Sequence, residues 1–385
     1  GYTGNINKTV KPNLMMKYYK NFRISDDENY RMGYINNAPN PKLRWEKTRD
    51  VKVALDFGLW KDRINGIVEA YWRKSKDCVT SEYVPVTTGF FNQSYNTSVL
   101  QNNGVEFSLS VAVLKSKDYN LSVSANVAWN QNKLKKYNSP NTSLALDKYV
   151  GYPMGAVFSG KYEGIDPETG MYKFKLRPDA VTNKDGYLRE PNNYYYYLGT
   201  SVAPFTGGFN LNFSYKNIGL SVGGSYSVKA KMVDNIESPA GYELLSGSKL
   251  ESIPTPHNDL YRNHLNVKRE VRNRWTPENR TGVKYPRLID AYGKKLGLDL
   301  TNPTLTTITR GALLEDISYL RINTIALSYS LPQRVLERIN FSSAALNLTL
   351  NNFFTITKYS GIDPEVPGAT YPVSRSVTIG LNVGF

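Results

Sequence analysis

The chain ends on the stretch Val377-Thr-Ile-Gly-Leu-Asn-Val-Gly-Phe385, in which apolar residues alternate strictly with small or polar ones. Successive side chains of a β-strand point to opposite faces, so one face of this segment is wholly apolar. The apolar face carries Val377, Ile379, Leu381, Val383 and Phe385. A transmembrane β-strand needs about nine to eleven residues of such alternation. If the pattern repeats along the chain, it predicts the wall of an outer-membrane β-barrel.

The same period of two recurs along the chain in pairs of segments joined by tight turns. Residues 51–59 alternate, residues 60–63 make a turn, and the next strand runs from residue 64 to about residue 74. Further strands are predicted at 105–113, 119–130, 209–215, 220–226, 325–331 and 346–351, with turns at 115–118 and 216–219. The second face of these strands is mostly Asn, Ser, Thr and Gly, whereas a soluble sandwich usually carries Lys, Glu and Thr there. Small neutral polar residues suit a wide, wet lumen or a lumen packed against a plug.

Long segments separate the hairpins, at 75–103, 134–205 and 229–315. Short periplasmic turns and long outer loops are typical of outer-membrane barrels, whereas such loops argue against a compact soluble domain. The loops are rich in Pro, Gly, Asn and Tyr, and one contains Tyr194, Tyr195, Tyr196 and Tyr197 in a row. Packing within the loop explains this run at least as well as contact with a ligand, and stacking of a substrate on it is a hypothesis.

The composition excludes several classes of protein. The 385 residues contain no run of 18 apolar residues, so membrane-spanning helices are not expected. The 29 Tyr, 14 Phe and 5 Trp fit the aromatic girdles of a barrel, although a Tyr-rich soluble β-protein or lectin is an alternative. Cys78 is the single cysteine, so no internal disulfide can form. His257 and His264 are interpreted as loop residues, and no zinc site or His-based triad is expected.

The net charge is +15, from 48 Lys and Arg against 33 Asp and Glu. Such an excess can indicate binding to nucleic acid, but these basic residues lie mainly between the strand patterns and form no dense stripe. We favour contact with anionic lipid head groups. The acidic turns Asp166-Pro-Glu168 and Asp363-Pro-Glu365 lack the spacing of a calcium loop and are interpreted as turns. No catalytic residue, metal or cofactor is predicted, and Glu106 is expected to contact a plug or a neighbouring strand.

Several short motifs stand in order along the chain. They are Tyr2-Thr-Gly-Asn5, Asn40-Pro-Lys-Leu-Arg-Trp-Glu-Lys-Thr48, Leu55-Asp-Phe-Gly58, Tyr71-Trp-Arg-Lys-Ser-Lys-Asp77, Asn102-Asn-Gly-Val-Glu106, Gly164-Ile-Asp-Pro-Glu-Thr-Gly170, Trp275-Thr-Pro-Glu-Asn279, Tyr319-Leu-Arg-Ile-Asn323, Leu327-Ser-Tyr-Ser-Leu-Pro332, Tyr359-Ser-Gly-Ile-Asp-Pro-Glu365 and Tyr371-Pro372. As an ordered set they resemble the C-terminal half of SusC-like (RagA-like) TonB-dependent transporters of the Bacteroidetes outer membrane. Each motif alone is a weak signal, but the ordered set is a strong one.

The resemblance implies an all-β fold, an antiparallel transmembrane β-barrel of which residues 1–385 form the C-terminal part. We count roughly eleven or twelve strand candidates, about half of the roughly 22 strands of a plugged barrel. We expect the plug domain and the N-terminal strands to lie outside this chain, because half a barrel leaves two open edges in lipid. The missing half is either a separate chain or an earlier part of a longer protein, since Gly1 is not a methionine.

The resemblance further implies active import of oligomeric nutrients, glycans or peptides, across the outer membrane. The implied partners are a SusD-like lipoprotein, TonB-ExbB-ExbD acting through the missing half, the BAM assembly machinery, and outer-membrane lipid and lipopolysaccharide, in a dimer of SusCD pairs. Phe385 resembles the C-terminal aromatic signal read during assembly. Two alternatives stay open: a passive or structural barrel without energy coupling, and a basic nucleic-acid-binding β-protein.

Overall fold

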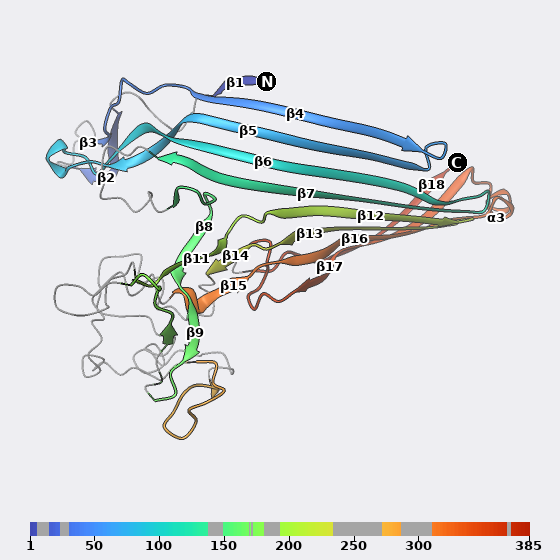
Figure 1. Cartoon of the computed structure of the whole chain (residues 1–385). Coiled ribbons are helices and arrows are strands. Elements are labelled where there is room, and N and C mark those ends of the chain that lie inside the picture. The colour runs from blue at the N-terminus through green and yellow to red at the C-terminus, as the bar shows by residue number, and fades with distance from the viewer. Residues whose placement is uncertain are drawn as a thin grey trace. The chain divides into compact units, whose positions relative to one another are not determined.

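The computed structural model describes residues 1–5, 15–23, 31–137, 149–168, 170, 172–180, 193–233, 272–285, 310–367 and 371–385. The described residues form antiparallel strands in nearly every element (Figure 1). They fall into two compact units, residues 1–111 with 124–154 and residues 112–123 with 155–385. Within the described part of the chain, no helix has both the length and the apolar character needed to cross a membrane.

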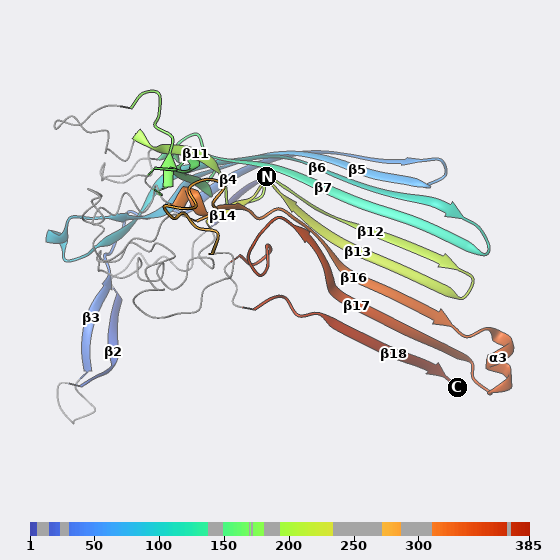
Figure 2. The ribbon, with the colours of Figure 1, turned by 90° about the horizontal axis from the view of Figure 1, so that it is seen from below.

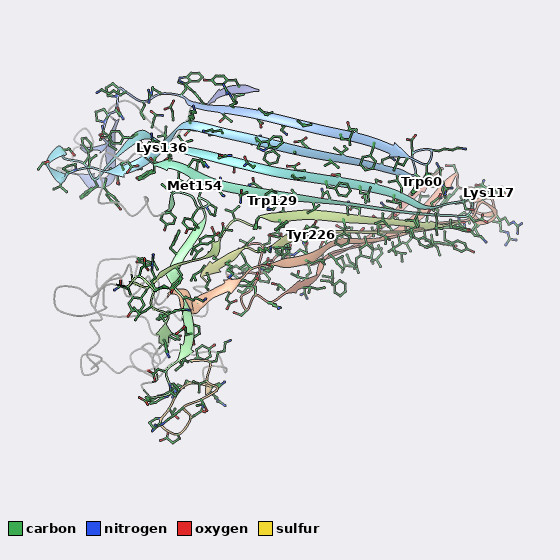
Figure 3. The ribbon with its side chains drawn as sticks, viewed as in Figure 1. Trp60, Lys117, Trp129, Lys136, Met154 and Tyr226 are labelled. Atoms are coloured by element: carbon green, nitrogen blue, oxygen red, sulfur yellow. The ribbon has the colours of Figure 1, made fainter. Side chains whose placement is uncertain are left out.

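The first unit is a meander of antiparallel strands in the order β1-β4-β5-β6-β7. The bounds are β1 Tyr2–Asn5, β4 Glu46–Leu59, β5 Ile64–Tyr83, β6 Asn92–Lys115 and β7 Tyr119–Tyr137. Two further strands, β2 (Met15–Arg23) and β3 (Arg31–Asn37), pair with each other. Leu59 pairs with Ile64, so residues 60–63 form the predicted tight turn, at which Trp60 lies (Figure 3).

The second unit contains five long strands in the order β12-β13-β16-β17-β18 (Figure 2). Their bounds are β12 Phe205–Tyr215, β13 Ile218–Val228, β16 Tyr319–Ser330, β17 Ser343–Thr357 and β18 Ser376–Gly384. Shorter antiparallel pairs join β8 (Ala156–Gly160) to β11 (Tyr195–Thr200), β9 (Tyr162–Ile165) to β10 (Tyr172–Phe174), and β14 (Lys231–Val233) to β15 (Leu314–Asp316). The helix α3 (Gln333–Arg338) connects β16 to β17.

Within each unit the strand registers gather the apolar residues on one face, called here the apolar face of that unit. In the second unit Leu327 pairs with Leu348, which pairs with Ile379, and in the first unit Leu55 pairs with Val68. Leu55 is 64% exposed and Ile379 is 72% exposed. Water-soluble proteins rarely expose a continuous apolar surface, whereas the outer face of a transmembrane barrel must be apolar. The predicted strand faces are therefore confirmed.

The buried apolar core is correspondingly small. Among the described residues of the second unit, one cluster of buried apolar residues consists of Ala230, Ile317 and Tyr359, with Ala203 and Met232 packed against it. These residues lie beside β14 and at the ends of β16 and β17, and not along the middle of the long strands. A sheet that is stabilised by lipid on one face does not need a second apolar layer of protein.

The long predicted loops contain more structure than the sequence indicated. Cys78 to Tyr83 of β5 pair with Asn92 to Ser98 of β6, inside the segment 75–103 that was predicted as a loop. This part of the ladder is held by backbone hydrogen bonds and has no apolar face. Its sequence therefore lacks the alternation of apolar residues from which the other strands were predicted. The turn predicted at 216–219 is shorter than expected, since Tyr215 pairs with Ile218 and only Lys216 and Asn217 remain between the strands.

Candidate functional site

The polar face of the second unit carries a shallow groove of about 420 Å³. Its lining combines apolar residues, among them Phe213, Leu220, Ala326 and Leu327, with small amides and hydroxyls, among them Asn120, Ser122, Asn212, Ser221, Asn347 and Thr349. The Ser221 hydroxyl donates to Asn212 Oδ1 at 2.8 Å. Neutral groups of this kind offer both donors and acceptors to water and to hydrophilic solutes without holding them by charge. The groove thus offers neutral hydrogen-bonding groups beside apolar residues.

The polar face of the first unit is charged, which differs from the predicted neutral face. Lys52 Nζ lies 2.6 Å from Glu69 Oε1, and Arg73 lies 2.9 Å from Asp50 Oδ2. Both pairs cross from β4 to β5, and Glu106 stands opposite Glu69 on β6. The carboxylates are about one-quarter exposed and their cations about half exposed. The motif at residues 102–106 predicted the correct face for Glu106, but it did not predict the charged residues beside it.

Glycine allows a tyrosine to lie across this face. Gly104 pairs with Tyr71, whose ring occupies the space that a Cβ at Gly104 would need. The Tyr71 hydroxyl reaches Asn130 Oδ1 of β7 at 3.2 Å. The Asn-Gly-Val-Glu motif therefore has a packing reason for its glycine. The outcome is a polar face tied across three strands.

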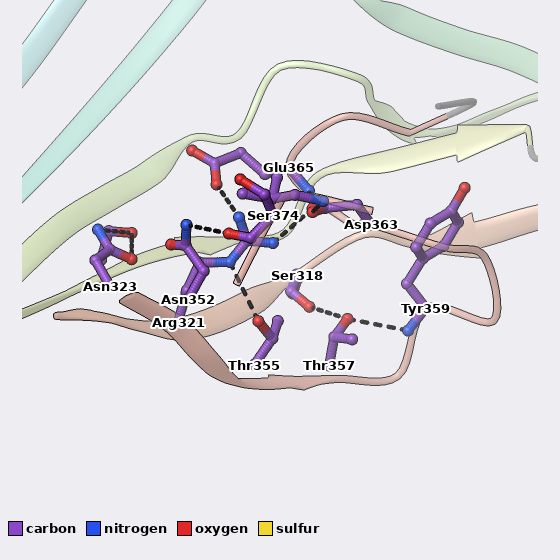
Figure 4. Close-up of polar contacts among 12 residues, drawn as sticks. Ser318, Arg321, Asn323, Asn352, Thr355, Thr357, Tyr359, Asp363, Glu365 and Ser374 are labelled. Atoms are coloured by element: carbon purple, nitrogen blue, oxygen red, sulfur yellow. Dashed lines mark hydrogen bonds and ion pairs between the residues drawn. The ribbon is translucent and has the colours of Figure 1, made fainter. Parts of the chain in front are cut away.

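Two motifs that are distant in the sequence meet at a buried ion cluster in the second unit (Figure 4). Arg321 of β16 donates to Asp363 Oδ1 and to Glu365 Oε2, both at 2.6 Å, and to Thr355 Oγ1 at 3.1 Å. The side chains of Arg321 and Asp363 are 5% and 4% exposed. Burial alone would raise the pKa of Asp363, but the Glu365 amide and the Arg321 guanidinium hydrogen-bond its carboxylate, and the net pKa is lowered. The predicted acidic turn 363–365 is thus the partner of an arginine.

The connections beyond the long strands of the second unit enclose a cavity of about 340 Å³, called here the aromatic cavity. Its lining includes Tyr162 of β9, Tyr172 of β10, Lys284, Tyr285, Leu313 and Glu315 of β15. The rings of Tyr162 and Tyr172 meet edge to face, with centroids 5.5 Å apart. Burial raises the pKa of Tyr162, so its hydroxyl stays protonated at neutral pH. Sequence reasoning missed these residues, although the motifs at 164–170 and 275–279 lie next to them.

Trp275 ties the segments of the aromatic cavity together. Its indole Nε1 donates to Pro167 O at 2.9 Å, and its backbone amide donates to Tyr285 O at 2.9 Å. Glu315 is fixed by Ser360, whose hydroxyl and amide donate to its two carboxylate oxygens at 2.5 and 2.8 Å. The cavity is therefore a formed site whose walls come from segments far apart in the sequence.

The tyrosine run lies on and next to β11, and none of its four members lines the aromatic cavity. Tyr195, Tyr196 and Tyr197 pair with Gly160, Ser159 and Phe158 of β8. The Tyr196 hydroxyl donates to Leu176 O at 2.8 Å, and the Tyr197 ring lies 5.7 Å from that of Phe158. Tyr194 directly precedes the strand. Substrate contact by this run stays a prediction.

The remaining predicted residues have the following places. Phe385 is 91% exposed and its ring meets Phe341 edge-on at 5.0 Å, and its role in assembly stays a prediction. Cys78 is buried. His257 and His264 lie outside the described residues. Among the residues that the structure describes, no group of three or more His, Cys, Asp or Glu could hold a metal ion.

Comparison with known proteins gives relatives by sequence and by structure. No protein-family model matches the chain. TonB-dependent receptor P26 of Formosa agariphila is 25% identical over 91% of this chain and 36% of its own length. TonB-dependent receptor SusC of Bacteroides thetaiotaomicron is 25% identical over 90% of this chain and 33% of its own length. The chain thus spans about a third of the length of these curated relatives.

A solved structure of the RagAB peptide importer in the closed-closed state matches all of this chain with a TM-score of 0.75 and 26% identity. The match covers 40% of that chain. The predicted all-β fold class is confirmed: the described strands are antiparallel strands of the TonB-dependent barrel type. The resemblance that the ordered motifs carried is confirmed by both comparisons.

Proposed function

We propose that this SusC-like (RagA-like) chain forms part of the wall of a TonB-dependent transporter, which imports oligomeric nutrients across the bacterial outer membrane. The observation that carries the proposal is the two-faced sheet. In each unit one face exposes aliphatic residues, such as Leu55 in the first and Ile379 in the second. The other face carries paired charges in the first unit and amides and hydroxyls in the second. Lipid stabilises the first face, and water or a hydrophilic cargo wets the second.

The proposed cargo is a glycan or a peptide. The structural neighbour is named as a peptide importer. The polar face of this chain suits either class of hydrophilic oligomer. The proposed machine is an active one: a SusD-like lipoprotein delivers the cargo, and the TonB-ExbB-ExbD complex drives import through parts of the transporter outside this chain. Assembly by the BAM machinery, contact with lipopolysaccharide and a dimer of SusCD pairs belong to the same proposal.

The test is uptake by whole cells that carry or lack the full-length gene. Fluorescently labelled pools of oligosaccharides and of decapeptides are offered, with and without a protonophore that collapses the proton-motive force. We expect deletion of the gene to abolish uptake of at least one pool, and the protonophore to do the same. Uptake that depends on the gene but survives the protonophore supports the alternative of a passive barrel. Uptake that is unchanged by deletion overturns import altogether.

A further inference from the structure

The short connections of the second unit join into one rim, called here the turn edge, which comprises residues 115–118, 216–217 and 331–342 (Figure 2). The Lys216 amide donates to Asp118 O at 2.7 Å, and the Asn217 side chain donates to Ser330 O at 2.8 Å. Helix α3 lies in the last of the three segments. Hydrogen bonds thus hold successive turns together at one end of the long strands.

The turn edge is basic and exposed. Five basic side chains outnumber two acidic ones: Lys115, Lys117, Lys216, Arg334 and Arg338 stand against Asp118 and Glu337. All seven residues are exposed, and Figure 3 shows Lys117 at this end of the strands. Within the described part of the chain, none of the five cations forms an ion pair. The edge therefore presents a net positive charge that attracts anions.

A row of apolar and tyrosine side chains borders the turn edge on the apolar face of the second unit. The strand register joins five residues in this row, in the order Tyr215, Ile218, Tyr329, Leu346 and Leu381. Their exposed fractions lie between 42% and 65%. The row crosses all five long strands directly beside the turns. Tyrosines and aliphatic residues next to a charged rim are typical of the boundary between acyl chains and head groups.

Lys216 connects the charged rim to the apolar row. Its Nζ lies 5.3 Å from the centroid of the Tyr215 ring, and Tyr215 belongs to the row. The ammonium group is therefore held on the side of the apolar face. A lysine in this position covers apolar surface with its stem and keeps its charge at the level of lipid head groups.

Helix α3 has the same combination of apolar and basic groups. Val335 and the capping residue Ile339 are four positions apart, so they lie on one side of the helix, and they are 42% and 43% exposed. Arg334 and Arg338 are also four positions apart and exposed. Leu336 is 5% exposed and anchors the helix to the protein. Such a helix suits the head-group layer, where its apolar side meets acyl chains and its arginines meet phosphate.

We propose that the turn edge binds anionic phospholipids, with Lys216, Arg334 and Arg338 on the head-group phosphate and the apolar row against the acyl chains. The inference rests on the proposed function, in which the apolar face of the second unit lies in lipid, and it adds a lipid partner at the end with the short turns. Short turns are typical of the periplasmic side, so the lipids are those of the periplasmic leaflet. Nucleic acid fits less well, because it has no apolar surface to cover the row.

The experiment uses the full-length protein that contains this chain, purified in detergent and stripped of bound lipid. Native mass spectrometry follows titration with phosphatidylglycerol, phosphatidylcholine and lipid A, and inorganic phosphate is added as a competitor. The edge variant combines Lys216→Gln, Arg334→Gln and Arg338→Gln. An exchange variant, with Lys216→Arg, Arg334→Lys and Arg338→Lys, keeps all three charges.

The matched control, called the hairpin variant, combines Lys161→Gln, Lys173→Gln and Lys175→Gln. These three lysines are exposed and lie on or next to β9 and β10 of the same unit, so the hairpin variant loses as much positive charge as the edge variant. The shift in apparent size between heated and unheated gel samples verifies that each variant is folded.

We expect wild type to bind phosphatidylglycerol about tenfold more tightly than phosphatidylcholine, because each cation near a lipid surface adds to the attraction for anionic head groups. The edge variant should lose most of this preference, whereas the hairpin and exchange variants should keep it. Inorganic phosphate should compete weakly, since it has no acyl chains to lie against the apolar row.

An equal preference for phosphatidylglycerol in the edge variant and wild type overturns the inference, as does an equal loss in the edge and hairpin variants. Displacement of lipid by inorganic phosphate at matched concentration would leave an anion site only. Tighter binding of lipid A than of phosphatidylglycerol would contradict the periplasmic leaflet. The lipid preference can vanish while uptake by cells persists, and uptake can fail while the preference persists, so the two proposals fail separately.

Discussion

A change at Arg321 should be strongly destabilising, because this residue neutralises the almost fully buried carboxylate of Asp363. Replacing it by Met in the full-length protein leaves Asp363, 4% exposed at its side chain, without its cation. Removing one partner of a buried ion pair typically costs about 3–5 kcal/mol. We expect the urea midpoint of unfolding in lipid vesicles, followed by tryptophan fluorescence, to fall accordingly.

The matched control is Arg177→Met. Arg177 also pairs with an aspartate at 2.6 Å, but its side chain and that of Asp179 are 40% and 65% exposed. Solvent screens such a pair, so its loss should lower the urea midpoint much less than the loss of the Arg321 pair does. Equal losses in the two variants would show that burial does not set the strength of the Arg321 cluster.

The same cluster predicts a pH dependence at the residue scale. The pKa of Asp363 is lowered from the ordinary value of 3.8, so its ionised form is favoured in the folded protein. Its contribution to stability is therefore present above about pH 3.8 and is lost as the pH falls through the lower, folded-state pKa. In Asp363→Asn, the decline of the unfolding free energy on the acid side should flatten. An unchanged acid slope in that variant would contradict this assignment.

At the scale of elements, β18 tests whether the apolar face meets lipid. Ile379, in the middle of the strand, is 72% exposed. A lysine at the bilayer midplane costs about 2–4 kcal/mol on the lipid face of a barrel, so Ile379→Lys should destabilise the full-length protein in vesicles by that amount. Thr378→Lys, on the polar face of the same strand, should cost less than about 1 kcal/mol. If water covered both faces, the two lysines would be tolerated equally well.

Strand pairing near the membrane could be predicted from sequence because one physical constraint acts on every second residue. Residues 51–59 and 377–385 alternate because lipid accepts only apolar side chains. The structure has strands at these two segments, β4 and β18. The long pairing of β5 with β6 beyond Ser75 could not be predicted in this way, since no lipid face shapes its sequence.

The residues of the candidate site could likewise be predicted from the sequence only in part. Tyr194 to Tyr197 attracted notice because they are consecutive, yet the cavity is lined by Tyr162, Tyr172 and Tyr285, which are single tyrosines in separate segments. Their proximity depends on contacts such as that of Trp275 with Pro167, which span more than a hundred residues. Arg321 and Asp363 were both quoted in motifs, but only their three-dimensional proximity shows that they neutralise each other.

At the scale of the whole molecule, the net charge of +15 allows two accounts of how the protein is held at a membrane or in the cell. In one, the aliphatic face is inserted in lipid, and the cations near the strand ends meet anionic head groups as a secondary contact. In the other, charge alone attaches a basic β-protein to an acidic surface or to nucleic acid. Only the second is governed by salt, because screening removes attraction between exposed charges but does not weaken apolar burial.

Membranes from cells that express the full-length protein should therefore retain it in a wash with 1 M NaCl, in which the Debye length is about 3 Å. The protein should be released only by detergent, since the exposed faces around Leu55 and Ile379 have no aqueous partner to replace lipid. A peripheral protein known to bind by charge, followed in the same samples, shows that the wash is effective. Release of this protein by salt alone, together with DNA affinity that falls steeply with salt concentration, would favour the nucleic-acid-binding alternative over a transport wall.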